Sequence, residues 1–173
     1  MVSAGVGTPI LGPLPAGCPV KLSALLPVGQ VLVPMTATSK DVAIRELLAL
    51  LPLDGEEERS LVYASVMQRE TELSTGIGRG VAIPHGKTTA VSRHVCAFGV
   101  ARHPVDFGAM DGLPCRIFFL CVSNPKQSLE HVRVLAQVAR VLNNQVARQA
   151  LENATTAEDV RRVFLDDEQR EGL

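Results

Sequence analysis

The sequence has 173 residues and a mass of 18.5 kDa, which is the usual size of one domain. Hydrophobic residues make up 46% and charged residues 20%, so the composition excludes a disordered tail, a collagen-like repeat and a coiled coil. Seventeen basic and eighteen acidic residues leave a formal net charge of −1, and aromatic residues make up only 3%. We therefore expect no nucleic-acid partner and no binding to an acidic membrane surface.

Residues 1–20 contain four glycines and four prolines, which indicates a flexible leader ahead of the folded domain. This stretch lacks the basic start of a signal peptide, and no apolar run approaches the ~20 residues that span a bilayer. The four cysteines form neither a metal-binding nor a disulfide pattern, so we expect reduced thiols and no metal. These features predict a cytoplasmic protein without membrane insertion, with one domain over 21–168 and a tail over 169–173.

The domain is expected to begin with a strand and two helices. Residues 30–35 form an apolar run that indicates a short strand, ended by its proline. Thr38 is in position to cap a helix over 42–51, where apolar residues recur at helical spacing. Asp54 is expected to cap a second helix that reaches about residue 70, since three glutamates in its first turn suit the helix dipole.

The middle of the sequence predicts strands. A glycine-rich turn at 74–80 leads into a short strand that ends at Pro84. Buried strands are expected at 95–100 and 117–122, and the Asp-Gly pair that starts at residue 111 predicts a tight turn or hairpin between them. Helices then precede and follow a central group of strands.

The last part of the sequence predicts three helices. Ser128 is expected to cap a long helix that ends near residue 142, and a short helix follows over 145–151. The capping sequence that starts at Thr155 opens a last helix over 157–165. With helices at both ends of a central group of strands, we expect one α/β domain of three layers, with helices on both faces of a mixed β-sheet.

His85 is the first candidate for chemistry. It lies at the end of the expected strand, between a rigid proline and a permissive glycine that would let a ligand or partner approach closely. A histidine with a pKa near ~6.5 is largely neutral in the cytoplasm, and a neutral imidazole can act as a nucleophile or a base. Position alone, however, favours a surface or core histidine without a role.

His131 and Arg69 would complete a site for phosphate. His131 falls in the first turn of the helix after Ser128, where free amides suit an anion. Arg69 ends the second helix and could supply a fixed cation, and both residues could equally be solvated. The remaining histidines, His94 and His103, are expected to be solvated.

Two other functional interpretations of the sequence, a dinucleotide-binding site and a hydrolase, have weaker support. The glycines of 74–80 do not form a dinucleotide motif, because a helix precedes them and a strand follows. Ser74 has no nucleophile-elbow sequence around it, so a hydrolase that uses His85 and His131 as base and acid lacks a nucleophile motif.

The run S-T-G-I-G-R-G-V-A-I-P-H-G-K, which ends at Lys87, resembles the enzyme IIA proteins of the bacterial phosphotransferase system, of the fructose, mannitol and nitrogen-regulatory type. The segment V-D-F-G-A-M-D-G at 105–112 and the helix of His131 follow in the same order as in that family. The resemblance covers roughly residues 20–167 and is closest to the nitrogen-regulatory branch. It identifies 21–168 as a IIA domain of type 2.

The resemblance implies a phosphocarrier without a cofactor. His85 would accept a phosphoryl group from the histidine of HPr, and Arg69 and His131 would help to hold it. A nitrogen-regulatory member would then control a target protein through its phosphorylation state, whereas a sugar-specific member would pass the group to a IIB domain. A domain that keeps the fold and only binds proteins is a third possibility, against which the presence of His85 argues.

Overall fold

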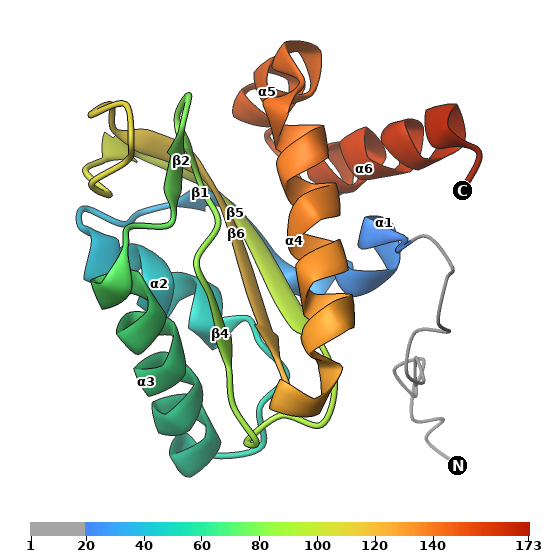
Figure 1. Ribbon diagram of the computed structural model, residues 1–173. Coiled ribbons are helices and arrows are strands. Elements are labelled where there is room, and N and C mark those ends of the chain that lie inside the picture. Colours follow the sequence, from blue (N-terminus) through green and yellow to red (C-terminus); the bar gives the residue numbers. More distant parts are fainter. Residues whose placement is uncertain (1–19) are drawn as a thin grey trace, which may run out of the picture.

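A mixed six-stranded sheet lies between two layers of helices in the computed structural model, which describes residues 20–173 (Figure 1). This arrangement confirms the expected three-layer α/β fold. The leader expected over 1–20 lies outside the described residues except for Val20. Within the described range, no helix is both long enough and apolar enough to cross a bilayer.

Most of the strands lie in the middle of the chain, with helices before and after them. In chain order, the elements are α1 (Leu22–Leu25), the 3-10 helix η1 (Val28–Gln30), β1 (Val31–Met35), α2 (Lys40–Ala49), α3 (Glu56–Glu72), β2 (Gly76–Gly78), β3 (Val81–Ala82), β4 (His85–Lys87), β5 (Val95–Val105), β6 (Cys115–Ser123), the 3-10 helix η2 (Pro125–Gln127), α4 (Ser128–Asn143), α5 (Gln145–Glu152) and α6 (Ala157–Glu171).

The long antiparallel pair of β5 and β6 forms the centre of the sheet, whose strand order is β1-β5-β6-β3-β2. The strands β3 and β4 both pair in parallel with β6, one after the other along its length. The expected turn between β5 and β6 is confirmed, with Gly112 at a φ of 72°. Contrary to expectation, β1 continues through Pro34, which an edge strand tolerates because its outer side needs no N–H donor.

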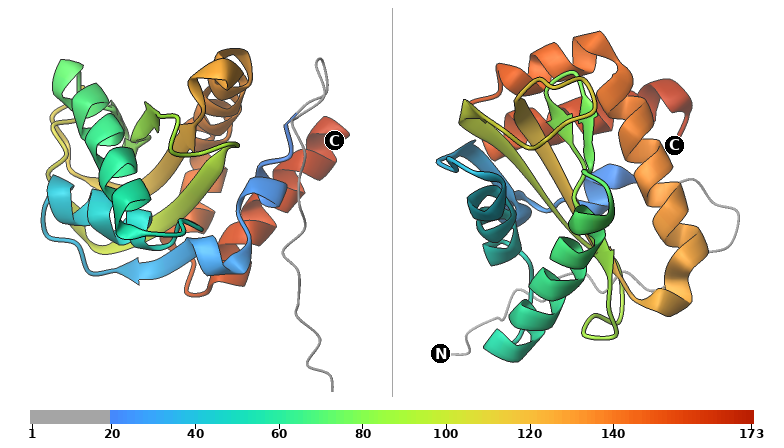
Figure 2. Two further views of the ribbon diagram at one scale, coloured as in Figure 1. Left: turned by 90° about the horizontal axis from the view of Figure 1, so that it is seen from below. Right: turned by 60° about the vertical axis from the view of Figure 1, so that its left-hand side comes forward.

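Each face of the sheet has its own hydrophobic core, and Figure 2 shows the sheet between the two helical layers. On one face, α2 and α3 bury residues such as Ile44 and Val66 against the sheet. On the other face, α1, α4, α5 and α6 pack around three phenylalanines that meet nearly edge to face, Phe98, Phe119 and Phe164. Burying one such side chain contributes about 1.5–3 kcal/mol to stability, so both layers are tightly held.

Two expected helix caps in the first half are each one residue off. Ser39, not Thr38, caps α2, where its Oγ accepts a hydrogen bond from the amide of Val42 at 3.3 Å. Gly55, not Asp54, precedes α3 and provides no side-chain cap. The amide of Asp54 instead donates to a glutamate of the first helical turn.

The helices of the second half also start or end differently from expectation. Ser128 lies inside the first turn of α4 and donates to the carbonyl of Pro125 at 2.8 Å, so it is not the cap. A capping box of Thr156 and Asp159 opens α6, one residue later than expected. The helix then runs to Glu171 and so takes up most of the expected tail.

The glycine-rich run is a short antiparallel hairpin, and not a simple turn between a helix and a strand. β2 pairs with β3, and between them Gly78, Arg79 and Gly80 all have positive φ angles, of 89°, 57° and 76°. Asp111 fixes the tip of the hairpin, because its Oδ2 accepts from the amide of Arg79 at 2.7 Å. The hairpin leads directly to the segment that holds His85.

We expect Gly86→Ala to destabilise the fold, because α3 packs directly on β4 at this glycine. An added Cβ would lie 2.6 Å from Ser65 Oγ and 2.9 Å from the backbone nitrogen of Val66, and helix backbone cannot yield cheaply. Overpacking of this kind costs about 1–3 kcal/mol. Urea unfolding measures the loss against Gly29→Ala, whose Cβ meets nothing within 4 Å. Equal midpoints for the two variants would contradict the packing of α3 on β4.

Candidate functional site

The candidate site lies where β4, β6 and β5 meet beneath the first turns of α4. His85 pairs with Cys121 of β6, and Cys121 pairs on its other side with Cys96 of β5. Paired residues of neighbouring strands share a face of the sheet. Both cysteines are buried in the core that α4 covers, so His85 is directed to the same side. Figure 1 shows β4 between α3 and α4.

His85 is half-buried, and one of its ring nitrogens is already engaged. Its Nδ1 lies 2.8 Å from the carbonyl oxygen of Ile83, and because a carbonyl only accepts, Nδ1 carries the proton. Burial lowers the pKa of His85, and the charges of Arg69 and Lys87 lower it further, while the Ile83 carbonyl and Glu70 act in the opposite direction. The ring is therefore neutral near pH 7, with the lone pair of Nε2 available as a nucleophile.

His131 lies beside His85, with the two ring centroids 5.6 Å apart. It is 2% exposed, and its Nδ1 lies 2.8 Å from Ser123 Oγ. Burial, with smaller effects from the nearby charges of His85, Lys87 and His94, lowers the pKa of His131 to about 4. His131 is consequently neutral at physiological pH and has one free ring nitrogen.

The contact with Ser123 indicates which nitrogen of His131 carries the proton. Within residues 20–173, Nδ1 of His131 is the only hydrogen-bond partner of the Ser123 hydroxyl. Ser123 is fully buried, so its O–H would lack an acceptor unless it donates to Nδ1, and this donation places the proton of the neutral ring on Nε2. This Nε2–H is buried and has no partner among the described residues. His131 thus offers an unused donor beside the nucleophilic ring of His85.

Two cations flank the pair of histidines. Lys87, two residues after His85, donates from Nζ to Ser128 Oγ at 3.1 Å and so ties β4 to the start of α4. Arg69 lies in the last turn of α3 and donates to the carbonyl of Leu73 at 2.8 Å. Across the described chain, no hydrogen bond joins Arg69 to either histidine. The structure therefore brings His85 and His131 together, while Arg69 acts on His85 through its charge.

His94 is the site residue that the sequence reasoning missed. We expected a solvated side chain, but His94 is 9% exposed and its ring faces that of His131, with centroids 6.1 Å apart and an interplanar angle of 26°. The pairing of Val95 with Val122 places His94 opposite Ser123. His94 and the buried Cys96 share a face by simple alternation, and this was the available signal. The other histidine expected to be solvated, His103, is exposed.

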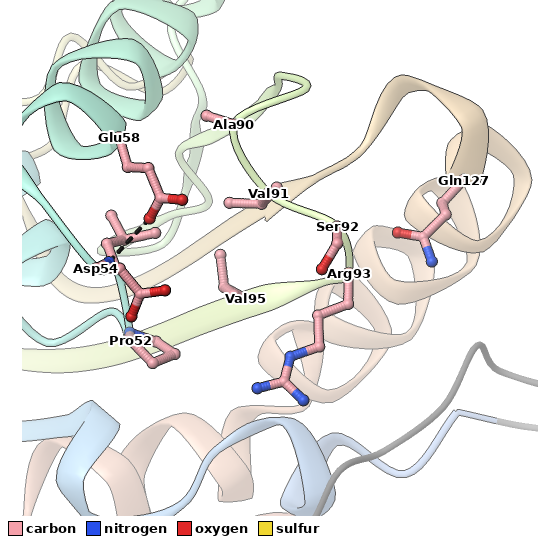
Figure 3. A pocket seen from close by; sticks show the side chains of 10 residues that line it. Pro52, Asp54, Glu58, Ala90, Val91, Ser92, Arg93, Val95 and Gln127 are labelled. Carbon is pink, nitrogen blue, oxygen red and sulfur yellow. Dashed lines mark hydrogen bonds between the residues drawn. The ribbon is translucent and has the colours of Figure 1, made fainter.

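A separate hollow of about 530 Å³ lies on the side of the sheet that α2 and α3 cover (Figure 3). Its wall includes Asp54, Glu58 and Arg93, and the Glu58 carboxylate already accepts from the amide of Asp54 at 2.8 Å. Neither His85 nor His131 lines it. This hollow is therefore distinct from the histidine site.

Comparison with known proteins identifies a family and several relatives that this chain resembles. The family model described as "Phosphoenolpyruvate-dependent sugar phosphotransferase system, EIIA 2" matches residues 24–167. The chain is 34% identical over 131 residues to the nitrogen regulatory protein of Bradyrhizobium diazoefficiens, which covers 75% of this chain and 85% of that one. It is 30% identical over 146 residues to the PTS system fructose-specific EIIA component of Haloferax volcanii, with 84% and 95% covered. The crystal structure of nitrogen regulatory protein IIA-Ntr from Neisseria meningitidis matches with a TM-score of 0.76 at 32% identity, over 83% of this chain and 98% of that one.

Proposed function

This chain belongs to the EIIA 2 family of the phosphoenolpyruvate-dependent sugar phosphotransferase system, and from that premise we propose that it is a phosphocarrier in which Nε2 of His85 accepts a phosphoryl group from an HPr-like protein. The observation that carries the proposal is the state of His85. Its pKa is lowered, its Nδ1 is committed to the Ile83 carbonyl, and its ring lies beside that of His131.

The transfer requires one bond to form as another breaks. The lone pair of His85 Nε2 attacks phosphorus, the bond between phosphorus and the donor histidine breaks, and its electron pair returns to the donor ring. The Nε2–H of His131 donates to a phosphoryl oxygen and thereby gains the partner that it lacks among the described residues. Lys87 and Arg69 add positive charge around the group.

We further propose that phosphorylation serves regulation, with a target protein as the partner. The 34% and 32% identities to two nitrogen regulatory proteins support this branch. The match to a fructose-specific EIIA component supports the alternative, in which the group passes to a IIB domain. A chase of the phosphorylated protein with a purified fructose-type IIB domain separates the two. Retention of the label favours regulation, and stoichiometric transfer within seconds would favour the sugar-specific role.

Intact mass spectrometry tests the phosphocarrier itself. The protein is incubated with phosphoenolpyruvate, enzyme I and HPr, and we expect one acid-labile phosphoryl adduct per chain. HPr that is shown to be phosphorylated in the same tube is the control for an active donor. An unmodified chain in the presence of phosphorylated HPr would count against this function.

The pH dependence of the transfer follows from the lowered pKa of His85. Only the neutral ring is a nucleophile, and the pKa lies below its ordinary value of 6.5. The decline in rate at low pH should therefore be centred below pH 6.5, where the ring takes up a proton. Single-turnover rates from about pH 5 to 8, with pre-formed phospho-HPr, measure this. A decline centred at or above 6.5 would contradict a ring shielded from water.

A further inference from the structure

Three imidazole rings form a row beneath α4. The ring centroids of His85 and His131 are 5.6 Å apart, and those of His131 and His94 are 6.1 Å apart. The ring of His94 lies at 26° to that of His131, whereas His85 is tilted by 52°. Nε2 of His94 is buried without a partner in the described part of the chain. An unpartnered buried nitrogen lowers stability, so the presence of this ring calls for another explanation.

The ring of His131 needs a second contact to hold its plane. Its hydrogen bond to Ser123 restrains the ring through one atom, Nδ1, and a hydrogen bond tolerates a range of ring angles. Rotation about the second side-chain torsion of histidine is only weakly restricted by itself. The flat face of His94 lies nearly parallel to this ring and limits the turn.

We propose that His94 is a positioning residue for the phosphoryl site, whose ring holds the plane of His131 so that the Nε2–H of His131 stays in place for a phosphoryl oxygen on His85. This inference rests on the proposed function. His94 acts through His131 and does not touch the transferred group. His94 lies directly before β5, next to the pair of Val95 and Val122, so the end of the sheet gives its backbone a rigid support.

The surroundings of the His94 and His131 rings keep both rings uncharged near pH 7. From β4, His131 faces His85 and Lys87, and from β6 it faces Ser123 and Cys121, whose Sγ lies 4.0 Å from Nδ1. Burial lowers the pKa of His94, and the charge of Glu130 on α4 offsets this in part. The ring of His94 is thus uncharged near pH 7, so it places no positive charge beside the Nε2–H of the neutral His131 ring.

Two variants separate the ring from its nitrogen atoms. His94→Ala removes the flat contact, and His94→Phe keeps a flat ring but no nitrogen. We expect His94→Ala to slow phosphoryl acceptance about tenfold, because the donor is no longer held in place. We expect His94→Phe to restore the rate to within about threefold of the wild type. His103→Ala, which changes an exposed histidine of β5, should leave the rate unchanged.

NMR of ¹⁵N-labelled histidine rings supplies a readout that requires no phosphoryl donor. In His94→Ala, the pKa of His131 should rise from about 4, because water reaches the ring and the repulsion from a His94 that is protonated at low pH is lost. The His131 signals should also show a mixture of tautomers. In His94→Phe, both should stay close to the wild type. These shifts would support the effect of His94 on His131 even if the wild type accepted no phosphoryl group. That failure would contradict the proposed phosphocarrier function alone.

Three results would overturn the proposal. One is a wild-type rate for His94→Ala. Another is a slower His94→Ala whose His131 signals and pKa are unchanged, because the loss would then not pass through His131. The third is a folded His94→Phe that is as slow as His94→Ala, which would assign the effect to a nitrogen atom. Thermal unfolding of each variant verifies that the folded protein is compared.

Discussion

His85→Ala should accept no phosphoryl group from phospho-HPr, while the protein remains folded. The variant loses a half-buried ring whose pKa is lowered and whose Nε2 has no hydrogen-bond partner among the residues that the structure describes. The side chain makes one hydrogen bond, to the Ile83 carbonyl, so the fold loses little. Intact mass after incubation with phosphoenolpyruvate, enzyme I and HPr measures the result.

His103→Ala is the matched control for this experiment, because it removes an exposed imidazole outside the site. It should be phosphorylated as fully as the wild type. If His85→Ala carried an acid-labile phosphoryl group at full stoichiometry, another residue would be the acceptor and the assignment of His85 would be wrong.

His131→Ala is expected to have the second largest effect, a loss of about 100-fold in the single-turnover rate of phosphoryl acceptance. Removing one preorganised donor from a buried anion site typically has an effect of this size. The donor in question is the Nε2–H, which has no partner among residues 20–173, on a ring that lies beside that of His85. His131→Gln, which keeps an N–H donor, should recover part of the loss.

Ser123→Ala is an informative companion to this pair. It leaves the ring of His131 in place but frees the tautomer that the Ser123 hydroxyl selects. We expect a smaller loss than for His131→Ala, about tenfold. If His131→Ala transferred at the wild-type rate, Nε2–H would have no part in holding the phosphoryl group, and the role inferred from its geometry would be wrong.

Residues whose position depends on local sequence could be predicted well. The long helices and the central strands β5 and β6 follow from hydrophobic spacing. The segment around His85 does not, because we expected a strand that ends at Pro84, whereas β3 ends at Ala82 and His85 begins β4. Two of the missed caps, at the starts of α2 and α6, involve adjacent hydroxyl residues, either of which could accept from a helix amide. For α2, the cap is Ser39, whose extended backbone directly precedes the first helical residue. Local sequence does not show at which of two neighbouring residues the helix begins.

Residues whose role depends on contacts across the sheet could not be predicted. His94 is buried because α4 covers the end of β5, and the two segments are far apart in the sequence. The glycines of 74–80 predict a tight turn, but the pairing of this run as a hairpin depends on Asp111 of a distant loop. Arg69 was placed correctly at the end of α3, whereas the direction of its long side chain was not readable from the sequence.

The most direct test of the central claim is to locate the phosphoryl group on the protein. Long-range ¹H–¹⁵N correlation of the phosphorylated, ¹⁵N-labelled protein identifies which ring nitrogen bears phosphorus. We predict a single modified ring, that of His85, with phosphorus on Nε2 and the proton still on Nδ1, where the Ile83 carbonyl holds it. Phosphorus on Nδ1 of His85, or on any other histidine, would contradict the account.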